Sequence, residues 1–518
     1  MRLRKSYGAF HVALEALYDG DSLQLAADER PPFDFDGGAF DDAAKAIYDR
    51  GGFTEDDMTT PEARRLITET ANSINRGVSS HLPHEVPPEL AYALENNGFI
   101  FSGFKTFHAL REVGLSMVTD DGSIKPFEQF RDDVKQIYQK YNVNWLYAEY
   151  KHAVGTSQMA VRWNDIAKDG DRYDLQYRTA GDDKVRADHA ALNGTTLPPS
   201  DPFWDRYYPP NGWGCRCTAI QVRIGKYQRS DSATAMKLGD DATEEAKQKM
   251  FRYNAGKTMQ LFPPKHPYYK APAKAQAVVQ QVSAEQLAQQ RIDDMIAEMP
   301  AHLTDNEKKA LAEHCVKLET ALGIRKGRRM TVEEADKQAA NPNLGKERGY
   351  SINCQTCAPA YVLRIMGFNV RAKSNRPGTK LDYLSRGHAF EVWRNLDGTP
   401  ATPVGTLQWM QAKGYNRMNQ SRYLEYFNEV CKETGIYELS IGWKGNKWNG
   451  HATILQRFPN GELRYIEPQN DNSKGSKREY RDIKALAADG TATPTRGRGI
   501  LRVDNKLFDD TYADIFDR

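Results

Sequence analysis

The segment SINCQTCAPAYVLRIMGFNV at residues 351–370 places Cys354 and Cys357 just before an apolar run that is typical of a short helix. Gly367 then ends the run, and a short extended stretch follows. A Cys-x-x-Cys pair in this position is compatible with four kinds of site. These are a metal knuckle, a redox pair, a buried structural corner and a cysteine nucleophile. The rest of the chain discriminates between them.

The composition is that of a globular protein with several domains. The chain has 518 residues, of which 40% are hydrophobic and 27% are charged, and this length predicts about three domains. Since 71 Lys+Arg residues face 69 Asp+Glu residues, no global basic charge indicates nucleic acid as the main partner. No apolar run approaches the roughly 18 residues of a membrane-spanning helix. Polar residues follow the basic start too soon for a signal peptide. We therefore expect no membrane partner and either retention in a cytoplasm or export by a route that does not read a signal.

Six cysteines are too sparse for a disulfide framework in a chain of this length. Four of them form two close pairs, Cys215/Cys217 and Cys354/Cys357. Close pairs in a reducing compartment require a chemical or local structural explanation. Cys315 and Cys431 stand alone and are expected to be buried apolar side chains.

Changes in local composition predict the domain organisation. Residues 41–168 have helical periodicity, whereas residues 173–222 are rich in the Pro, Gly, Trp and Tyr of short strands and turns. Residues 268–291 are rich in Ala, Gln and Lys and have little to bury, which indicates an interdomain linker. The predicted fold class is multidomain α+β, with an N-terminal arm (1–40), an α+β domain that begins with helices (41–225), a linker region (226–295), a helical connector (296–343) and a second α+β domain (344–518).

The turn-rich segment contains residues of the types that bind zinc. His189, Cys215 and Cys217 are candidate ligands for a structural zinc ion, and Asp188 or Asp201 can supply a fourth, oxygen donor. The Cys-x-Cys spacing is unusual for such a site, in which two residues normally separate the cysteines. The alternative is a metal-free fold in which aromatic side chains pack under loops that contain proline.

This segment resembles the phage Mu protein F-like family, the minor head (head-morphogenesis) proteins of tailed phages. The resemblance rests on RTAGDDKVRADHAALNGTTL (178–197), DPFW (201–204) and YPPNGWGCRCTAI (208–220), and it covers about 60–225. It implies a virion protein assembled in the bacterial cytoplasm, present in a few copies near the portal. Portal and capsid proteins would be its partners, and packaged DNA would lie close by. The resemblance implies no catalysis by this segment.

The last domain supplies a histidine and a carboxylate for a cysteine nucleophile. Residues 450–469, GHATILQRFPNGELRYIEPQ, predict a β-hairpin that turns at its Pro-Asn-Gly sequence. In this hairpin His451 begins one strand and Glu467 lies near the end of the other, so both lie at one end of the sheet. A cysteine at a helix N-terminus has a lowered pKa, and a histidine takes its proton. A carboxylate or amide then orients the imidazole.

The same residues resemble the papain-fold toxin domains of polymorphic toxin systems, several of which follow Mu F-like head proteins in one chain. The resemblance is carried by NCQTCAPAYVLRIMGFNVRA (353–372), by a Gly-His-Ala before a strand and by LRYIEPQ (463–469), and it covers about 345–518. It implies a papain-like α+β domain in which a cysteine, His451 and Glu467 form the catalytic site. The family usually has Asp in place of Glu467, which leaves Gln469 as the alternative orienting residue.

The identity of the nucleophile stays open between Cys354 and Cys357. If Thr356 is the N-cap residue, Cys357 begins the helix and Pro359 falls at its third position, where a missing N–H costs little. The family motif favours Cys354 instead, because the Asn-Cys pair is its more constant part.

We expect a papain-like thiol hydrolase that needs no cofactor and acts on a host protein, either as a protease or as a glutamine deamidase. Three other interpretations of the cysteine pair remain: a redox pair, a zinc site with His388 or His451, and a structural corner. His388 also precedes a strand, but no carboxylate follows it on a partner hairpin. For the whole protein, the alternative is a non-catalytic, portal-proximal capsid assembly protein whose last domain is a binding or spacing module.

Overall fold

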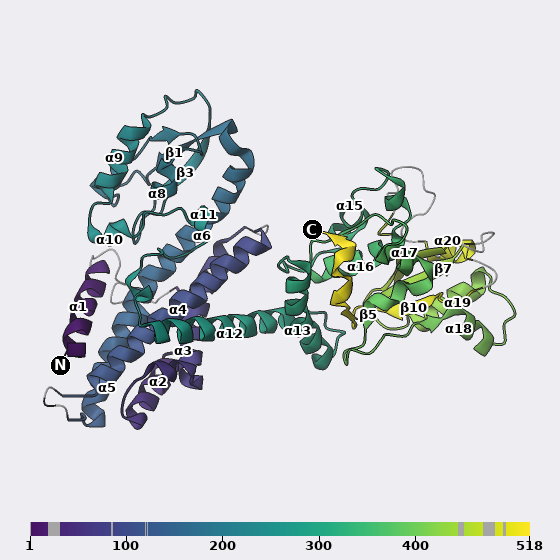
Figure 1. Ribbon diagram of the computed structural model, residues 1–518, viewed down its shortest axis with the longest axis horizontal. Helices are drawn as coiled ribbons and strands as arrows, with labels where there is room; N and C mark the ends of the chain where they lie inside the picture. The colour runs from purple at the N-terminus through teal and green to yellow at the C-terminus, as the bar shows by residue number, and fades with distance from the viewer. Residues whose placement is uncertain are drawn as a thin grey trace. The chain divides into compact units, whose positions relative to one another are not determined.

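The structure, a computed structural model, describes residues 2–18, 32–83, 86–119, 121, 123–443, 450–469, 482–490 and 494–518. It divides the chain into two compact units, Met1–Gln290 and Arg291–Arg518 (Figure 1). Each unit has buried hydrophobic clusters of its own. The mixture of helices and small sheets agrees with the predicted multidomain α+β class.

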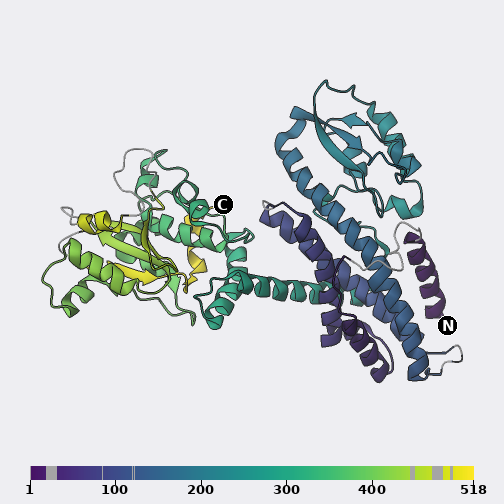
Figure 2. The same cartoon turned by 180° about the vertical axis from the view of Figure 1, so that it is seen from behind.

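The first unit combines a helical bundle with a three-stranded sheet. Its helices and strands are α1 (Arg2–Leu17), α2 (Gly37–Arg50), α3 (Pro61–His81), α4 (Pro88–Ser116), α5 (Phe127–Tyr138), α6 (Leu146–Asp169), β1 (Tyr173–Arg178), α7 (Ala187–Ala190), β2 (Thr196–Leu197), α8 (Phe203–Tyr207), β3 (Thr218–Arg223), α9 (Ser232–Ala242), α10 (Ala246–Lys249), α11 (Ala255–Thr258) and α12 (Ala273–Glu298), which continues into the second unit. The strand order is β2-β1-β3, and both pairs are antiparallel. Helices α3, α4 and α6 lie side by side, as both ribbon views show (Figures 1 and 2).

A buried ion pair lies inside this bundle. Lys105 of α4 contacts Glu149 of α6, and their side chains are 1% and 0% exposed. The hydroxyl of Tyr18 donates a hydrogen bond to the other carboxylate oxygen of Glu149 at 2.7 Å. The two charges therefore compensate each other in a site that water does not reach.

The expectation that residues 1–40 form an arm outside the core is wrong for the end of α1. Leu14 and Tyr18 are buried, and the ring of Tyr18 stacks on Trp145 and Trp213, with centroids 4.7 Å and 5.1 Å apart. The Asp- and Pro-rich composition that indicated an arm lies mostly in residues 19–31, which are outside the described residues.

Residues 226–295, expected as a linker region, are folded. They form α9, α10, α11 and most of α12, and all but their last residues belong to the first unit. The aromatic side chains of Phe251, Phe262 and Tyr268 are buried in its core. The Ala- and Gln-rich part that indicated a linker is the helix α12, because alanine has the strongest helix propensity.

Replacing Phe262 with alanine is expected to lower the free energy of unfolding of the first unit by about 3–5 kcal/mol. The ring is fully buried and stacks on Phe101 with centroids 3.6 Å apart. Urea unfolding of the full chain, followed by tryptophan fluorescence, measures the change. Lys265→Ala, an exposed position of the same stretch, is the control and should change stability by less than about 0.5 kcal/mol. Equal effects of the two substitutions would mean that this stretch is a linker in solution.

The second unit is built around a five-stranded sheet. Its helices and strands are α13 (Asp305–Leu322), α14 (Val332–Ala335), α15 (Lys337–Ala340), α16 (Cys354–Met366), β4 (Arg371–Ala372), α17 (Lys380–Tyr383), β5 (Trp393–Arg394), β6 (Val404–Gly405), α18 (Thr406–Ala412), α19 (Gln420–Val430), β7 (Gly435–Gly442), β8 (Gly450–Arg457), β9 (Leu463–Ile466), α20 (Ile483–Asp489), β10 (Gly499–Arg502), β11 (Leu507–Phe508) and β12 (Phe516–Asp517). The strand order is β6-β10-β7-β8-β9, and all neighbouring pairs are antiparallel. Two further antiparallel pairs are β11-β5 and β12-β4.

Helices cover both faces of the five-stranded sheet. Side chains alternate between the faces along each strand, and Ile436 and Ile454 lie on the face that packs against α16. Tyr437 and Leu455 lie on the opposite face, against α18 and α19. Helix α13, expected as part of a connector, also contributes to this unit, because its Cys315 is buried in the same cluster as α16.

The predicted hairpin is confirmed. Strands β8 and β9 pair antiparallel up to Arg457 and Leu463, and Gly461 in the turn has the left-handed φ of 82° that favours glycine. The hairpin lies at one edge of the sheet, next to β7. It brings the first residues of β8 close to the end of β9.

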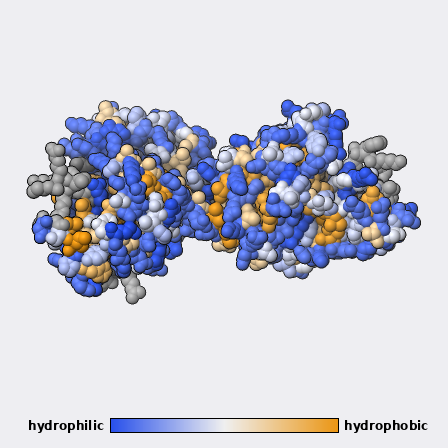
Figure 3. Space-filling view, turned by 60° about the horizontal axis from the view of Figure 1, so that its bottom comes forward, coloured by the Kyte–Doolittle hydropathy of each residue, from blue (hydrophilic) through white to orange (hydrophobic). Residues whose placement is uncertain are grey.

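The apolar side chains of both units are gathered mainly in their buried clusters. The face drawn in Figure 3 is largely hydrophilic, with apolar residues in separate patches. Among the described residues, no helix combines the length and the apolar character that crossing a membrane requires.

Candidate functional site

Helix α16 begins at Cys354, directly after the N-cap residue Asn353. The N–H groups of Thr356 and Cys357 both donate to the main-chain carbonyl of Asn353, at 2.9 Å and 3.1 Å. The expectation that Thr356 is the N-cap residue is therefore wrong, and Pro359 lies inside the helix. Pro359 has no N–H to donate to the preceding turn of the helix. Packing offsets the cost of this missing hydrogen bond, since the helix is buried along nearly its whole length.

Three side chains from three elements meet at the start of α16. His451 is the second residue of β8, and its Nε2 lies 2.7 Å from Oε2 of Glu467, which directly follows β9. The thiol of Cys354 lies close enough to His451 for the two groups to shift each other's pKa. Its Sγ donates a hydrogen bond to Oε1 of Gln355 at 3.7 Å. The predicted proximity of His451 and Glu467 is confirmed, and their catalytic role stays a prediction.

The charges of these groups shift one another's pKa. Burial disfavours the charged form of His451, but the negative charge of Glu467 and the contact with Cys354 raise the pKa of His451 to about 10. Burial also disfavours the Cys354 thiolate, yet His451 holds the pKa of this thiol below its ordinary value. The pKa of Glu467 is lowered by His451 in spite of burial. The imidazole of His451 is therefore mainly protonated at neutral pH, and its charge favours the thiolate form of Cys354.

Cys357 has the properties of a core residue. Its side chain is 0% exposed and belongs to the cluster beneath α16, and burial raises the pKa of its thiol well above the ordinary value. Cys354 is partly exposed. Of the two cysteines, Cys354 is thus the candidate nucleophile, and Cys357 is a natural control.

Hydrogen bonds hold Glu467 against the imidazole. The hydroxyl of Tyr465 donates to Oε2 of Glu467, and the N–H of Gln469 donates to Oε1 at 3.1 Å. The side-chain amide of Gln469 instead donates to Oδ1 of Asn353 at 3.2 Å. Glu467 is therefore the residue that contacts His451, and Gln469 joins the end of the hairpin to the start of α16.

A buried carboxyl group that the sequence did not indicate lies near the thiol. Glu438 of β7 is 0% exposed, and its Oε2 accepts a hydrogen bond from Nε1 of Trp393 at 2.7 Å. Burial raises the pKa of Glu438 to about 8, and the charge of Cys354 contributes to the increase. At neutral pH the group is therefore mainly protonated, so it places little negative charge beside a thiolate.

Arg498 and Trp443 are two further neighbours that the sequence did not indicate. Nη1 of Arg498 donates to Oγ of Ser440 at 3.1 Å, and the guanidinium is near enough for its charge to interact with Cys354. A Cβ at Gly450 would lie 2.2 Å from this guanidinium, so glycine makes room for it. The ring of Trp443 stacks on His451 with centroids 5.4 Å apart. These side chains become neighbours through strand pairing, which no local motif reveals.

His388 lies in a different pair. Its Nδ1 is 2.6 Å from Oε1 of Glu391, and its ring stacks on Tyr383 with centroids 4.0 Å apart. The interpretation of the Cys354/Cys357 pair as a zinc site gains no support from the described residues, in which the one group with metal-binding geometry lies in the first unit.

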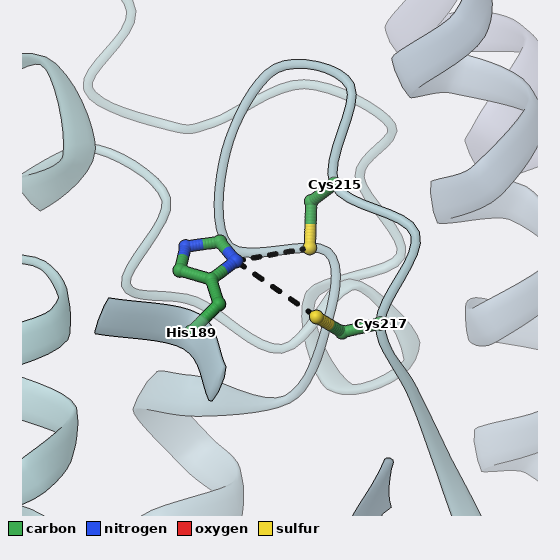
Figure 4. Close-up of side chains that lie close together, drawn as sticks. All are labelled: His189, Cys215 and Cys217. Atoms are coloured by element: carbon green, nitrogen blue, oxygen red, sulfur yellow. Dashed lines mark hydrogen bonds between the residues drawn. The ribbon is translucent and has the colours of Figure 1, made fainter. Parts of the chain in front are cut away.

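That group consists of His189, Cys215 and Cys217. Nδ1 of His189, on α7, lies 3.5 Å from Sγ of Cys215 and 3.8 Å from Sγ of Cys217, both in the loop that enters β3 (Figure 4). The three potential ligand atoms lie within 4.8 Å of one another. The structure thus brings together the three predicted ligands that lie far apart in the sequence.

The two aspartates considered as a fourth ligand have other partners. Oδ1 of Asp188 accepts the N–H of His189 at 2.9 Å, and Oδ2 accepts the side-chain amide of Gln248 at 3.1 Å. Oδ1 of Asp201 accepts the N–H of Phe203 at 2.9 Å. Neither aspartate belongs to the cluster.

Comparison with known proteins identifies part of the first unit. Residues 123–220 match the family described as Phage Mu protein F like protein. The chain is 40% identical to the Mu-like prophage FluMu F protein of Haemophilus influenzae over 68 residues, which are 12% of this chain and 16% of the relative. It is 32% identical to the putative capsid assembly protein F of Escherichia phage Mu over 148 residues, 27% of this chain and 31% of the relative. The chain thus spans less than a third of either relative, and no solved structure matches it significantly.

Proposed function

We propose that this protein is a minor head protein of a phage or prophage, and that its second unit is a papain-like cysteine hydrolase. The match of residues 123–220 and the similarity to a putative capsid assembly protein support the first part. Portal and capsid proteins would then be its partners. One observation carries the second part: the thiol of Cys354, at the first position of α16, meets His451, which in turn is hydrogen-bonded to Glu467.

The arrangement is suited to acyl transfer from an amide. The thiolate of Cys354 attacks the carbonyl carbon, and the tetrahedral intermediate expels the amine, which takes a proton from His451. His451 then takes a proton from water, the resulting hydroxide attacks the thioester, and the C–S bond breaks. The products are the restored thiolate and a carboxylic acid, which releases its proton to water as a carboxylate. N–H groups at the start of α16 are of the kind that stabilise the oxyanion.

Proteolysis and glutamine deamidation share these steps and differ in the leaving group. A protease releases a new amino terminus, and a deamidase releases ammonia. We propose a host protein as the substrate in either case. The two activities are therefore distinguished by their products.

Iodoacetamide is expected to modify Cys354 of the full chain rapidly well below pH 8, because the imidazolium of His451 stabilises its thiolate. Between pH 8 and pH 6 the rate should fall less steeply than that of an ordinary thiol, which loses about tenfold per pH unit below its pKa. Peptide mapping by mass spectrometry at several pH values measures both the rate and the site. His451→Ala should restore the steep pH dependence of an ordinary thiol.

The buried thiols of Cys357 and Cys431 are internal controls and should remain unmodified in the folded chain. A steep pH profile at Cys354 in the unmodified protein would contradict the proposed site. An unchanged shallow profile in His451→Ala would show that this histidine does not activate the thiol.

A further inference from the structure

We infer that His189, Cys215 and Cys217 bind one zinc ion, with the fourth coordination position filled by water. Their arrangement has the dimensions of a zinc site. Tetrahedral zinc with Zn–S of about 2.3 Å and Zn–N of about 2.05 Å places a sulfur and a nitrogen ligand about 3.6 Å apart. The observed separations are 3.5 Å and 3.8 Å.

Convergence on one nitrogen favours a metal over hydrogen bonds alone. Both sulfurs approach Nδ1 of His189, and the three side chains point toward one another (Figure 4). An imidazole nitrogen has a single lone pair, so it accepts one well-aligned S–H hydrogen bond and cannot accept from both thiols at once. A metal ion placed between the three atoms satisfies all of them. Both cysteines are free, so no disulfide accounts for their proximity.

The surroundings of the cluster resemble those of a built site. The side chains of His189 and Cys217 are 2% and 6% exposed, whereas Cys215 is partly exposed and opens the cluster toward solvent. Nε2 of His189 is buried and has no hydrogen-bond partner within the described residues. The polar contacts of the ring are therefore those of Nδ1 with the two sulfurs.

The position in the fold gives such an ion a structural task. Helix α7 has four residues, and the loop from Tyr208 to Cys217 has no helix or strand before β3. Helix α7 has only about one turn of backbone hydrogen bonds, and the loop has no regular secondary structure to fix it. A zinc ion would join the two directly, at the end of β3 that pairs with Arg178 of β1.

The metal content of the full chain tests this inference. Protein purified under reducing conditions without chelator is expected to contain one zinc ion per chain, as measured by inductively coupled plasma mass spectrometry. Protein stripped by a chelator and titrated with Co²⁺ should develop thiolate-to-cobalt charge-transfer bands and the intense visible bands of tetrahedral cobalt. His189→Ala and Cys217→Ser should reduce bound zinc to less than about a tenth. Cys354→Ala, which removes the reactive thiol of the second unit, should retain all of it.

Two results would overturn the inference. One is a wild-type chain that holds no zinc and shows no cobalt bands, a measurement that does not depend on the folding of any variant. The other is loss of the metal in Cys354→Ala with retention in Cys217→Ser, which would place the ion in the second unit. Should Cys217→Ser fail to fold, Cys215→Ser replaces it, because this position is partly exposed.

Discussion

Replacing Cys354 with alanine is expected to lower the hydrolytic rate by about 10³-fold or more, because it removes the nucleophile that forms the acyl intermediate. The measurement uses the purified full chain and a bacterial lysate as the source of substrate. Ammonia release and new amino termini are recorded separately, since the first marks deamidation and the second proteolysis. Growth of bacteria that express the chain provides an independent measurement, and Cys354→Ala should relieve any toxicity.

The neighbouring residues provide the controls. Cys357→Ala should retain activity, because this buried thiol lies in the core beneath α16 and not at the site. His451→Ala should be about as inactive as Cys354→Ala, since residues that act as a unit have non-additive effects. Glu467→Gln should retain the fold, but its hydrolytic rate should fall by about 10²–10⁴-fold, because the substitution disturbs the tautomer and orientation of the imidazole. A fully active Cys354→Ala variant would contradict the proposed hydrolase. It would favour the alternative, in which the second unit is a non-catalytic binding or spacing module.

A large loss of stability is expected from breaking the Lys105–Glu149 ion pair. Lys105→Met leaves the Glu149 carboxyl group in a fully buried site without its countercharge, and such a change lowers the free energy of unfolding by about 3–5 kcal/mol. Urea unfolding monitored by circular dichroism and tryptophan fluorescence measures the effect on the first unit.

A double variant separates the lost partner from the lost packing. Lys105→Met combined with Glu149→Met removes both charges, and buried pairs replaced by apolar residues are often neutral in stability. We therefore expect the double variant to regain most of the loss. Lys45→Met breaks the exposed Lys45–Asp49 pair and should cost less than about 1 kcal/mol. If Lys105→Met lowered the free energy of unfolding as little as Lys45→Met, the buried ion pair would not stabilise the first unit, contrary to this prediction.

Local sequence was sufficient for the hairpin and for the meeting of His451 with Glu467. A strong turn signal and two alternating strands determine the register of the hairpin. The register in turn predicts which residues at the end of β9 lie beside the first residues of β8. The choice of cysteine could not be made in this way. Pro359 indicated a later helix start by local rules, but burial of α16 in the core of the second unit overrode that preference.

Contacts between distant segments explain what the sequence did not reveal. Phe262 lies in the predicted linker region 226–295, yet its ring packs on Phe101 of a helix far away in the chain. Arg498 comes near Cys354 because β10 pairs with β7, and Glu438 does so because β7 pairs with β8. Strand order is not encoded in any short motif. Residue types identified the cluster of His189, Cys215 and Cys217 in the sequence, whereas their separations required coordinates.

The position of β10 has a consequence for the synthesis of the protein. This strand lies between β6 and β7, although it follows both β8 and β9 in the chain. A ribosome therefore delivers α16 and its thiol long before the strand that completes the sheet against which this helix packs. Closing such non-local pairings is slow, and the nascent second unit exposes its half-finished core until β10 has emerged. We therefore expect the site of Cys354, His451 and Glu467 to be completed only after residues 499–502 have been translated.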